Sequence, residues 1–335
     1  MIKESIIKLT NNQNLTNQET FQTIDEIMSG QASDIQISSF LTALSMKGET
    51  IDEITSAAKA MRNHGQTISP EKEVLEIVGT GGDGSNTFNI STTSAIVISS
   101  AGVPIAKHGN RSASSKCGAA DVLEELGVNI NLSPEKNLEL LNEINICFLF
   151  AQKYHSAMKH VAPVRGELAI RTIFNILGPL TNPAKATIQV LGVFDETLVE
   201  SLAKVLQNLG VKRGMVVYGQ DKLDEISVCD KTTVCEIKGN ELLSYEISPQ
   251  DFGIQLANKE DLVGGDPSRN AEITLNILKG EKSPKRDAVI LNSAAGLYVS
   301  GKVNSLKEGV QLATELIDSG KALQQLERFI KYSNE

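Results

Sequence analysis

The sequence lacks the features of a membrane-spanning or secreted protein. Its 335 residues contain no uninterrupted run of about 18 apolar residues, the length that a membrane-spanning helix needs. Residues 1–5 show no basic stretch followed by an apolar core, so we expect no signal peptide. These absences predict a cytoplasmic protein with no membrane partner.

Cysteine and histidine are also scarce, and acidic residues outnumber basic ones. The four cysteines show no C-x-x-C spacing, which favours free thiols in a reducing compartment. The four histidines show no metal-ligand spacing, and no Ser/His/Asp nucleophile arrangement is evident. The net charge of -9 argues against general nucleic-acid binding, although local basic clusters can still hold phosphates.

Apolar periodicity predicts two parts of different fold class. Residues 1–65 have the pattern of short helices, with helical spacing over 34–46 and a capping-box pattern from Thr50 to Glu53. Beyond them, strands and helices alternate, which indicates a largely parallel sheet covered on both faces. We predict an α/β protein with a small all-helical domain, residues 1–68, and a larger α/β domain with a mostly parallel central sheet, residues 69–335.

A helical insert at about residues 152–184 interrupts the strand–helix alternation. Helices are predicted at 154–160 and 164–177, the second stopped by Gly178 and Pro179. We assign this insert to the helical domain. Short strands are also predicted at 128–131 and 227–229.

A glycine-rich loop joins a strand predicted at 74–78 to a helix predicted at 91–101. Four glycines within six residues allow positive φ angles and close approach of backbone N–H groups, which is typical of phosphate binding ahead of a helix. No lysine completes a Walker A motif. The dinucleotide pattern G-x-G-x-x-G does match Gly79–Gly84, but Asp83 would place negative charge beside a pyrophosphate. A tight turn without a ligand is the plainer alternative.

A basic loop and a pair of acids follow two other predicted strands. The loop at 107–118 carries Lys107, Arg111 and Lys116, and the acids are Asp224 and Glu225. Carboxyl ends of parallel strands share one edge of the sheet, so these groups predict a ligand with several phosphates and a magnesium ion. Taken alone, a charged loop or adjacent acids more often simply face water.

Arg165 begins a predicted helix of the insert among small residues. It predicts either a clamp for a carboxylate substrate or an ordinary surface salt bridge. His155 and Met158, on the same insert, are packing residues by default.

Five motifs in this order resemble the anthranilate phosphoribosyltransferase family over nearly the whole chain, from Thr16 to about Leu316. The matching segments are GTGGDG at 79–84, NIST at 89–92, KHGNR at 107–111, VAPVR at 161–165 and LDEI at 223–226. The resemblance implies a helical domain that forms a homodimer, hinged to the α/β domain. It also implies Mg²⁺-dependent transfer of phosphoribose from phosphoribosyl pyrophosphate to anthranilate, in tryptophan biosynthesis.

The resemblance also implies site residues, carried over position by position. Those expected to bind the donor are Gly79, Gly82, Asp83, Thr87, Asn89, Ile90, Ser91, Thr92, Lys107, His108, Gly109, Asn110, Arg111, Ser112, Ala113, Ser114, Ser115 and Ala119. Those expected to bind anthranilate are Gly79, His108, Asn110, His155, Met158 and Arg165. Ser91, Asp224 and Glu225 are expected to hold magnesium. The chain departs from common family forms at Ala119 (often serine), Ser156 (often proline) and 220–222 (often richer in glycine).

Two rival functions stay open on sequence alone. Pyrimidine-nucleoside phosphorylases resemble this fold and also use a glycine-rich phosphate loop, but free phosphate needs no bridging magnesium, so Asp224 and Glu225 favour the transferase. A nucleic-acid-binding relative without catalysis would have a basic surface and eroded motifs, which the net charge and the intact motifs disfavour.

Overall fold

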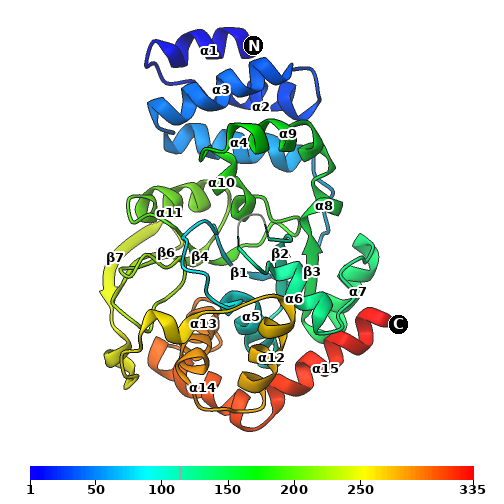
Figure 1. The fold of residues 1–335 in the computed structure, drawn as a ribbon, viewed down its shortest axis with the longest axis vertical. Helices are drawn as coiled ribbons and strands as arrows, with labels where there is room; N and C mark the ends of the chain where they lie inside the picture. The colour runs from blue at the N-terminus through cyan, green and yellow to red at the C-terminus, as the bar shows by residue number, and fades with distance from the viewer. Residues whose placement is uncertain (113–114) are drawn as a thin grey trace.

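The computed structural model describes residues 1–112 and 115–335, which form a smaller helical part and a larger part built on a sheet (Figure 1). The helical part begins with α1 (Ile2–Thr10), α2 (Asn17–Met28), α3 (Asp34–Lys47) and α4 (Ile51–Asn63). Three of these helices start with capping boxes, in which Thr16, Ser33 and Thr50 accept a hydrogen bond from the backbone N–H three residues later. The helices predicted at 34–46 and after Thr50 are confirmed.

The larger part contains one seven-stranded sheet in the order β3-β2-β1-β4-β5-β6-β7. Strands β1 to β5 pair in parallel, and β6 and β7 are antiparallel, so the predicted fold class is confirmed. The strands are β1 (Leu75–Gly79), β2 (Ile105–Gly109), β3 (Ile146–Phe150), β4 (Ile188–Gly192), β5 (Arg213–Gly219), β6 (Thr232–Lys238) and β7 (Glu241–Ile247). Since β2 and β4 flank β1, the strand order reverses there, and such a point binds ligands at its carboxyl edge.

Two apolar cores lie on opposite faces of the sheet. Helices α5 (Ile90–Ser100) and α13 (Pro284–Val299) pack on one face, and α11 (Leu198–Asn208) packs on the other. The second core runs from α11 into the four N-terminal helices, through contacts between α4 and α11. The remaining helices of the larger part are α6 (Ala119–Glu125), α7 (Pro134–Ile144), η3 (Pro249–Phe252), η4 (Lys259–Leu262), α12 (Pro267–Leu278), α14 (Leu306–Asp318) and α15 (Lys321–Asn334).

The insert between β3 and β4 is a series of short helices, with α9 packed against α3 (Figure 1). They are α8 (Ala151–Tyr154), η1 (Ser156–His160), α9 (Ala162–Leu168), α10 (Phe174–Leu177) and η2 (Gly178–Leu180). The prediction of one helix over 164–177 is wrong. Ala169 adopts a left-handed conformation with φ 49°, which ends α9 and redirects the chain before α10 begins.

The strands predicted at 128–131 and 227–229 are also wrong. At 227–229 the Ser227 hydroxyl accepts hydrogen bonds from the backbone N–H groups of Cys229 and Asp230, which turns the chain instead of extending it. Near residue 130 the side chain of Asn129 bonds the backbone N–H of Asn131 in the same way.

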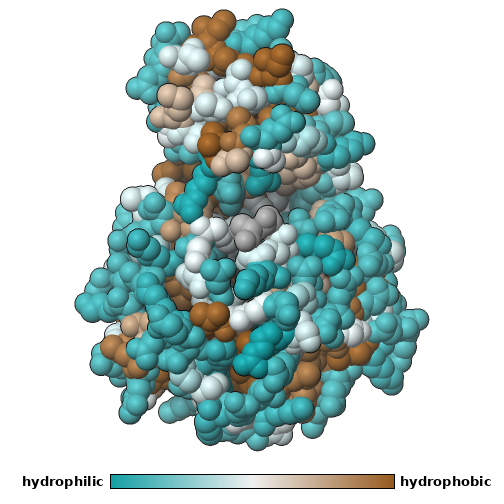
Figure 2. Space-filling view, in the orientation of Figure 1, coloured by the Kyte–Doolittle hydropathy of each residue, from teal (hydrophilic) through white to brown (hydrophobic). Residues whose placement is uncertain are grey.

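Much of the surface is hydrophilic, but apolar residues gather at the end of the molecule formed by the N-terminal helices (Figure 2). Exposed large apolar side chains there include Ile7 on α1 and Ile35 and Met46 on α3. In the described ranges, no helix is both long and apolar enough to cross a membrane.

Candidate active site

Loops that follow β1, β2 and β5 meet at the carboxyl edge of the sheet, and two glycines let them approach closely. A Cβ built on Gly79 would overlap the Asp224 carboxylate, and one built on Gly192 would overlap the Asp224 carbonyl oxygen. The acidic loop therefore lies directly across the ends of β1 and β4. The structure thus brings the glycine loop and the paired acids together.

The glycine loop is held in a conformation that leaves backbone donors available. Gly81, Gly82 and Gly84 have φ angles of 71°, 75° and 75°, which side-chain-bearing residues rarely adopt. The N–H of Gly81 donates to Asp224 Oδ2 at 2.6 Å. Among the described residues, no acceptor pairs with the N–H groups of Gly82, Asp83 or Gly84, so these groups can bind an anion.

Three charged or polar side chains converge on the start of α5. The N–H of Ser91 donates to Glu225 Oε1 at 3.2 Å, and Lys107 Nζ donates to Ser91 Oγ at 3.2 Å and to the Ile77 carbonyl at 2.8 Å. The basic, glycine-rich and acidic segments of the sequence therefore share one site. The positive end of the α5 dipole also points at this site.

The carboxylates of the site are held close to one another at low solvent exposure. Burial, with Asp83 and Glu225 nearby, raises the pKa of Asp224 well above its usual value. Burial raises the pKa of Glu225 to about 7, although Lys107 opposes this shift. Burial also lowers the pKa of Lys107 to about 8. One lysine among three acids leaves an excess of negative charge that a divalent cation would neutralise.

The donor set fits magnesium in particular. Mg²⁺ is usually held by one or two carboxylates together with substrate phosphates and water. In residues 1–112 and 115–335, no group of three or more Asp, Glu, His or Cys side chains could hold a metal without other ligands. Asp83 Oδ2 is buried and has no hydrogen-bond partner. Asp224 and Glu225 would therefore hold the ion jointly with oxygens of a bound anion.

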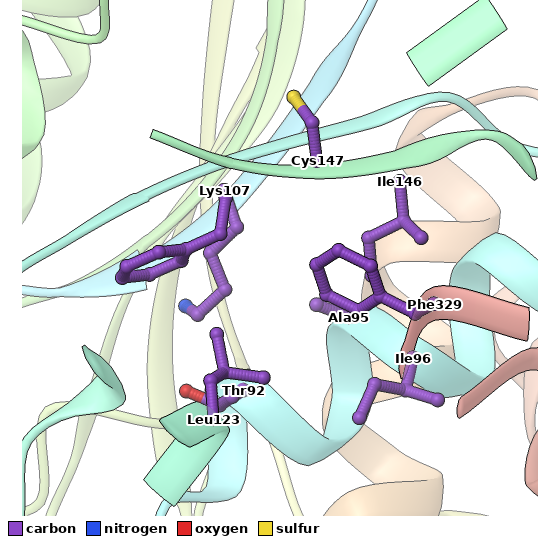
Figure 3. Close-up of a pocket in the computed structure, with 9 residues that line it drawn as sticks. Thr92, Ala95, Ile96, Lys107, Leu123, Ile146, Cys147 and Phe329 are labelled. Atoms are coloured by element: carbon purple, nitrogen blue, oxygen red, sulfur yellow. The ribbon is translucent and has the colours of Figure 1, made fainter. Parts of the chain in front are cut away.

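Two cavities adjoin these loops and differ greatly in size. A cavity of about 290 Å³ lies between the glycine loop, the end of the basic loop and residues 263–265, and is large enough for part of a ligand. Behind α5, a cavity of about 10 Å³ has room for about one water molecule. Figure 3 shows this smaller cavity, with Lys107 extending from β2 toward Thr92. Of these two cavities, only the larger one, between the loops, therefore has room for part of a ligand.

The basic loop contributes less free positive charge than its sequence suggests. Arg111 pairs with Asp121 at 3.0 Å and with Glu124 at 2.5 Å, and these contacts raise its pKa. Asp121 also accepts the N–H of Ser112 at 3.0 Å. Lys107 is thus the basic group that the structure places deepest in the site. The predicted donor residues Ala113 and Ser114 lie outside the described residues.

Lys107 and His108 point to opposite faces of β2, because side chains alternate along a strand. His108 faces the insert, where its ring lies 5.0 Å from the ring of His155 in an edge-to-face arrangement. Burial lowers the pKa of His108 to about 3 and that of His155 to about 4, so both rings are neutral. His155 Nε2 donates to the Thr181 carbonyl at 3.1 Å. His108 Nε2 and His155 Nδ1 are buried and have no hydrogen-bond partner among the described residues.

Arg165 lies on α9, half-buried, with its guanidinium 5.7 Å from the ring centre of Phe174. Burial lowers its pKa. No carboxylate among the described residues forms a salt bridge with Arg165. The structure therefore does not show the ordinary surface salt bridge that was the alternative to a carboxylate clamp. Met158 is half-buried against the helical core. Asn110 is exposed, and its side chain accepts the N–H of Arg111.

The other predicted residues line the same two loops. Thr87 pairs with Val263 in an isolated bridge, and Ala119 begins α6. Asn89 occupies the N-cap position of α5 without a side-chain cap hydrogen bond. Ile90 and Thr92 are buried in the first turn of α5, so Ile90 can offer a ligand only its backbone. Gly109 ends β2, and Ser115 bonds Ser112.

Comparison with known proteins identifies the family. The model of the glycosyl transferase family helical bundle domain matches residues 3–65, and that of the a/b domain matches residues 71–323. The anthranilate phosphoribosyltransferase of Methanobrevibacter smithii is 67% identical over 334 residues, covering 100% of both chains. The chain belongs to the anthranilate phosphoribosyltransferase family.

Solved structures of this family share the whole fold. The anthranilate phosphoribosyltransferase of Thermus thermophilus superposes with a TM-score of 0.94 at 43% identity, covering 99% of both chains. The Saccharomyces cerevisiae enzyme, solved in complex with PRPP and Mg, gives a TM-score of 0.92 at 31% identity, covering 99% of this chain and 98% of that one. The family assignment therefore covers both the helical and the α/β parts.

Three residues that sequence reasoning missed support the predicted site of this family member. Asn270 on α12 is buried and accepts the N–H of Asn89 at 3.2 Å, which fixes the start of α5. Glu76 is fully buried on β1 and accepts the N–H of His108 at 3.2 Å. Asn182 donates to the Ala106 carbonyl at 2.8 Å. Of these three residues, only Glu76 could have been found from the sequence, because it is a charged residue inside the apolar run at 74–78.

Proposed function

We propose that this protein transfers the 5-phosphoribosyl group from phosphoribosyl pyrophosphate to the amine of anthranilate. The products are N-(5-phosphoribosyl)anthranilate and pyrophosphate, and the step belongs to tryptophan biosynthesis in the cytoplasm. The proposal depends on one observation. The unpaired N–H groups of the glycine loop, Lys107 and the Asp224–Glu225 pair lie together at the carboxyl edge of the sheet. This set suits a polyanionic sugar ester bridged by Mg²⁺ better than a single free phosphate.

Donor binding is assigned to the glycine loop, the start of α5 and the basic loop. The N–H groups of Gly82, Asp83 and Gly84 would hold phosphate oxygens, and Lys107 would supply positive charge. Ser91, Asp224 and Glu225 would hold Mg²⁺, which when bound neutralises the leaving pyrophosphate. Burial of these groups strengthens their electrostatic interactions with the donor.

Acceptor binding is assigned to the insert side of β2. Arg165 would bind the anthranilate carboxylate, since no protein carboxylate occupies it. The neutral rings of His108 and His155 would line the approach to this position. Gly79 and Asn110 lie at the ends of β1 and β2, where donor and acceptor would meet.

Catalysis would rest on positioning and charge stabilisation. Breaking the bond at the anomeric carbon builds positive charge on the ribose and negative charge on the pyrophosphate. An aryl amine is neutral at pH 7 and attacks without a strong base, so we assign no general base and no covalent intermediate. Closure of the helical part over the α/β part would exclude water from the donor.

We also propose a division of the chain into two domains. The helical domain comprises residues 1–68 and the insert at about 152–184, and the α/β domain comprises residues 69–335. The packing of α9 on α3 supports it. We also propose a homodimer through the helical domain, supported by the exposed Ile7, Ile35 and Met46. Sedimentation velocity would test this, because a monomer at micromolar concentration contradicts it.

The activity is tested by following the loss of anthranilate fluorescence in the presence of phosphoribosyl pyrophosphate and Mg²⁺. We expect consumption that requires all three components and releases pyrophosphate. Thymidine and uridine with phosphate serve as the control for the phosphorylase alternative. Phosphorolysis of either nucleoside, without anthranilate consumption, would refute the proposed function.

A further inference from the structure

Arg171 joins the insert to the glycine loop by two side-chain contacts. The residue lies between α9 and α10, outside both helices. Its Nη2 donates to the Gly82 carbonyl at 2.5 Å. Its guanidinium also lies 4.0 Å from the ring centre of Phe194, well within the range of a cation–π interaction.

The Phe194 ring that Arg171 covers is itself tied to the glycine loop. The N–H of Phe194 donates to Thr80 Oγ1 at 3.2 Å, and the N–H of Thr80 donates to the Gly192 carbonyl at 2.9 Å. Both contacts of Arg171 therefore act on the same loop, one at Gly82 and one through Thr80. Asp224 holds the loop from the other side through the N–H of Gly81.

The backbone of Arg171 is anchored in the helical part. Ser45 Oγ on α3 donates to the Arg171 carbonyl at 3.1 Å. The next residue, Thr172, donates its N–H to Asn175 Oδ1 at 2.9 Å, which fixes the chain ahead of α10. Arg165, on the same segment, lies six positions earlier. One short stretch of the insert thus carries both the proposed acceptor clamp and a contact to the proposed donor loop.

We propose that Arg171 is a positioning residue that holds the glycine loop in the form that accepts the donor's phosphates, using the helical part as its support. Gly82 turns its carbonyl toward Arg171, and the planar trans peptide then directs the N–H of Asp83 away from that contact. Without Arg171 the loop would keep its Asp224 contact but lose its restraint at Gly82. This inference rests on the proposed function.

The test is the affinity for Mg²⁺–phosphoribosyl pyrophosphate without acceptor, measured by isothermal titration calorimetry. Loss of one charge-assisted hydrogen bond and one cation–π contact predicts that Arg171→Ala weakens binding about tenfold. Arg171→Lys keeps the charge but loses the planar stacking, so it should restore part of the affinity. Phe194→Leu removes the ring alone and should weaken binding less, in the same direction.

Arg328→Ala is the matched control. Arg328 on α15 makes the same two kinds of contact, with a ring, Tyr332, at 5.9 Å and a backbone carbonyl, Glu143, at 3.2 Å. It lies in the C-terminal helix, which carries none of the proposed site residues, so donor affinity should stay at the wild-type value. In kinetic assays, Arg171→Ala should raise the KM for the donor about tenfold and that for anthranilate less than twofold.

The outcomes separate this inference from the proposed function. If the wild-type protein does not bind the Mg²⁺–donor complex, the proposed function fails first. If the wild-type protein binds it and both Arg171→Ala and Phe194→Leu bind equally well, Arg171 is not a positioning residue. An equal loss of affinity in Arg328→Ala would also overturn the inference, because the effect would then be a general loss of stability.

Discussion

Replacing Gly192 by alanine should weaken Mg²⁺-dependent activity while the protein still folds. The new Cβ would overlap the backbone carbonyl of Asp224, which cannot rotate away as a side chain could. Restoring van der Waals separation requires a shift of roughly 2 Å in the acidic loop. Overpacking of this kind costs about 1–3 kcal/mol of folding free energy. Mg²⁺ demands near-ideal ligand geometry, so the displaced Asp224 and Glu225 should lower activity by about 100-fold.

The assay is the initial rate of anthranilate consumption as a function of Mg²⁺ concentration, with the melting temperature measured in parallel. Gly214→Ala is the matched control, because Gly214 is also a strand glycine whose Cβ would overlap a backbone carbonyl, that of Gln189. Gly214 lies at the opposite end of the sheet, at the start of β5. We expect both variants to have a lower melting temperature. Only Gly192→Ala should require a higher Mg²⁺ concentration to reach half of its maximal rate. A Gly192→Ala protein with the wild-type Mg²⁺ response would refute this account of the acidic loop.

Three further predictions concern individual side chains. Arg165→Ala should raise the KM for anthranilate about 10- to 100-fold and that for the donor far less, since a charge-assisted hydrogen bond is lost; equal changes in both would exclude the clamp role. Burial raises the pKa of Glu225 to about 7, so Mg²⁺ affinity should rise as the pH increases through 7. Calorimetry should show a weaker dependence of Mg²⁺ affinity on pH in Glu225→Gln. Burial holds the pKa of His108 near 3 and that of His155 near 4, below their usual 6.5. As the pH falls, both histidines are therefore protonated in the unfolded chain at a higher pH than in the folded protein. The free energy of unfolding should therefore fall as the pH drops from 6.5 toward 4, and urea titrations of His108→Phe should show a shallower fall.

The sequence was most informative where local chemistry decides local structure. A capping-box pattern located the helix after Thr50, and strand–helix alternation located the parallel sheet. The three loops could be placed at one edge because parallel strands share their direction. The family resemblance then implied which residues of those loops bind donor, acceptor and magnesium, and these roles stay predictions.

The remaining features depend on contacts between distant segments. The break at Ala169 is a left-handed residue that helical periodicity does not reveal. The ion pairs of Arg111 with Asp121 and Glu124 depend on how α6 packs beside its loop. Arg171 reaches Gly82 across 89 positions in the sequence, and no local pattern predicts such a contact.

The most direct test of the site is a crystal structure of the protein soaked with phosphoribosyl pyrophosphate and Mn²⁺, whose anomalous signal locates the ion. The account predicts a peak beside the carboxylates of Asp224 and Glu225, with the donor's phosphates against the N–H groups of residues 82–84 and Lys107. An ordered donor elsewhere, or an anomalous peak remote from both acids, would contradict it.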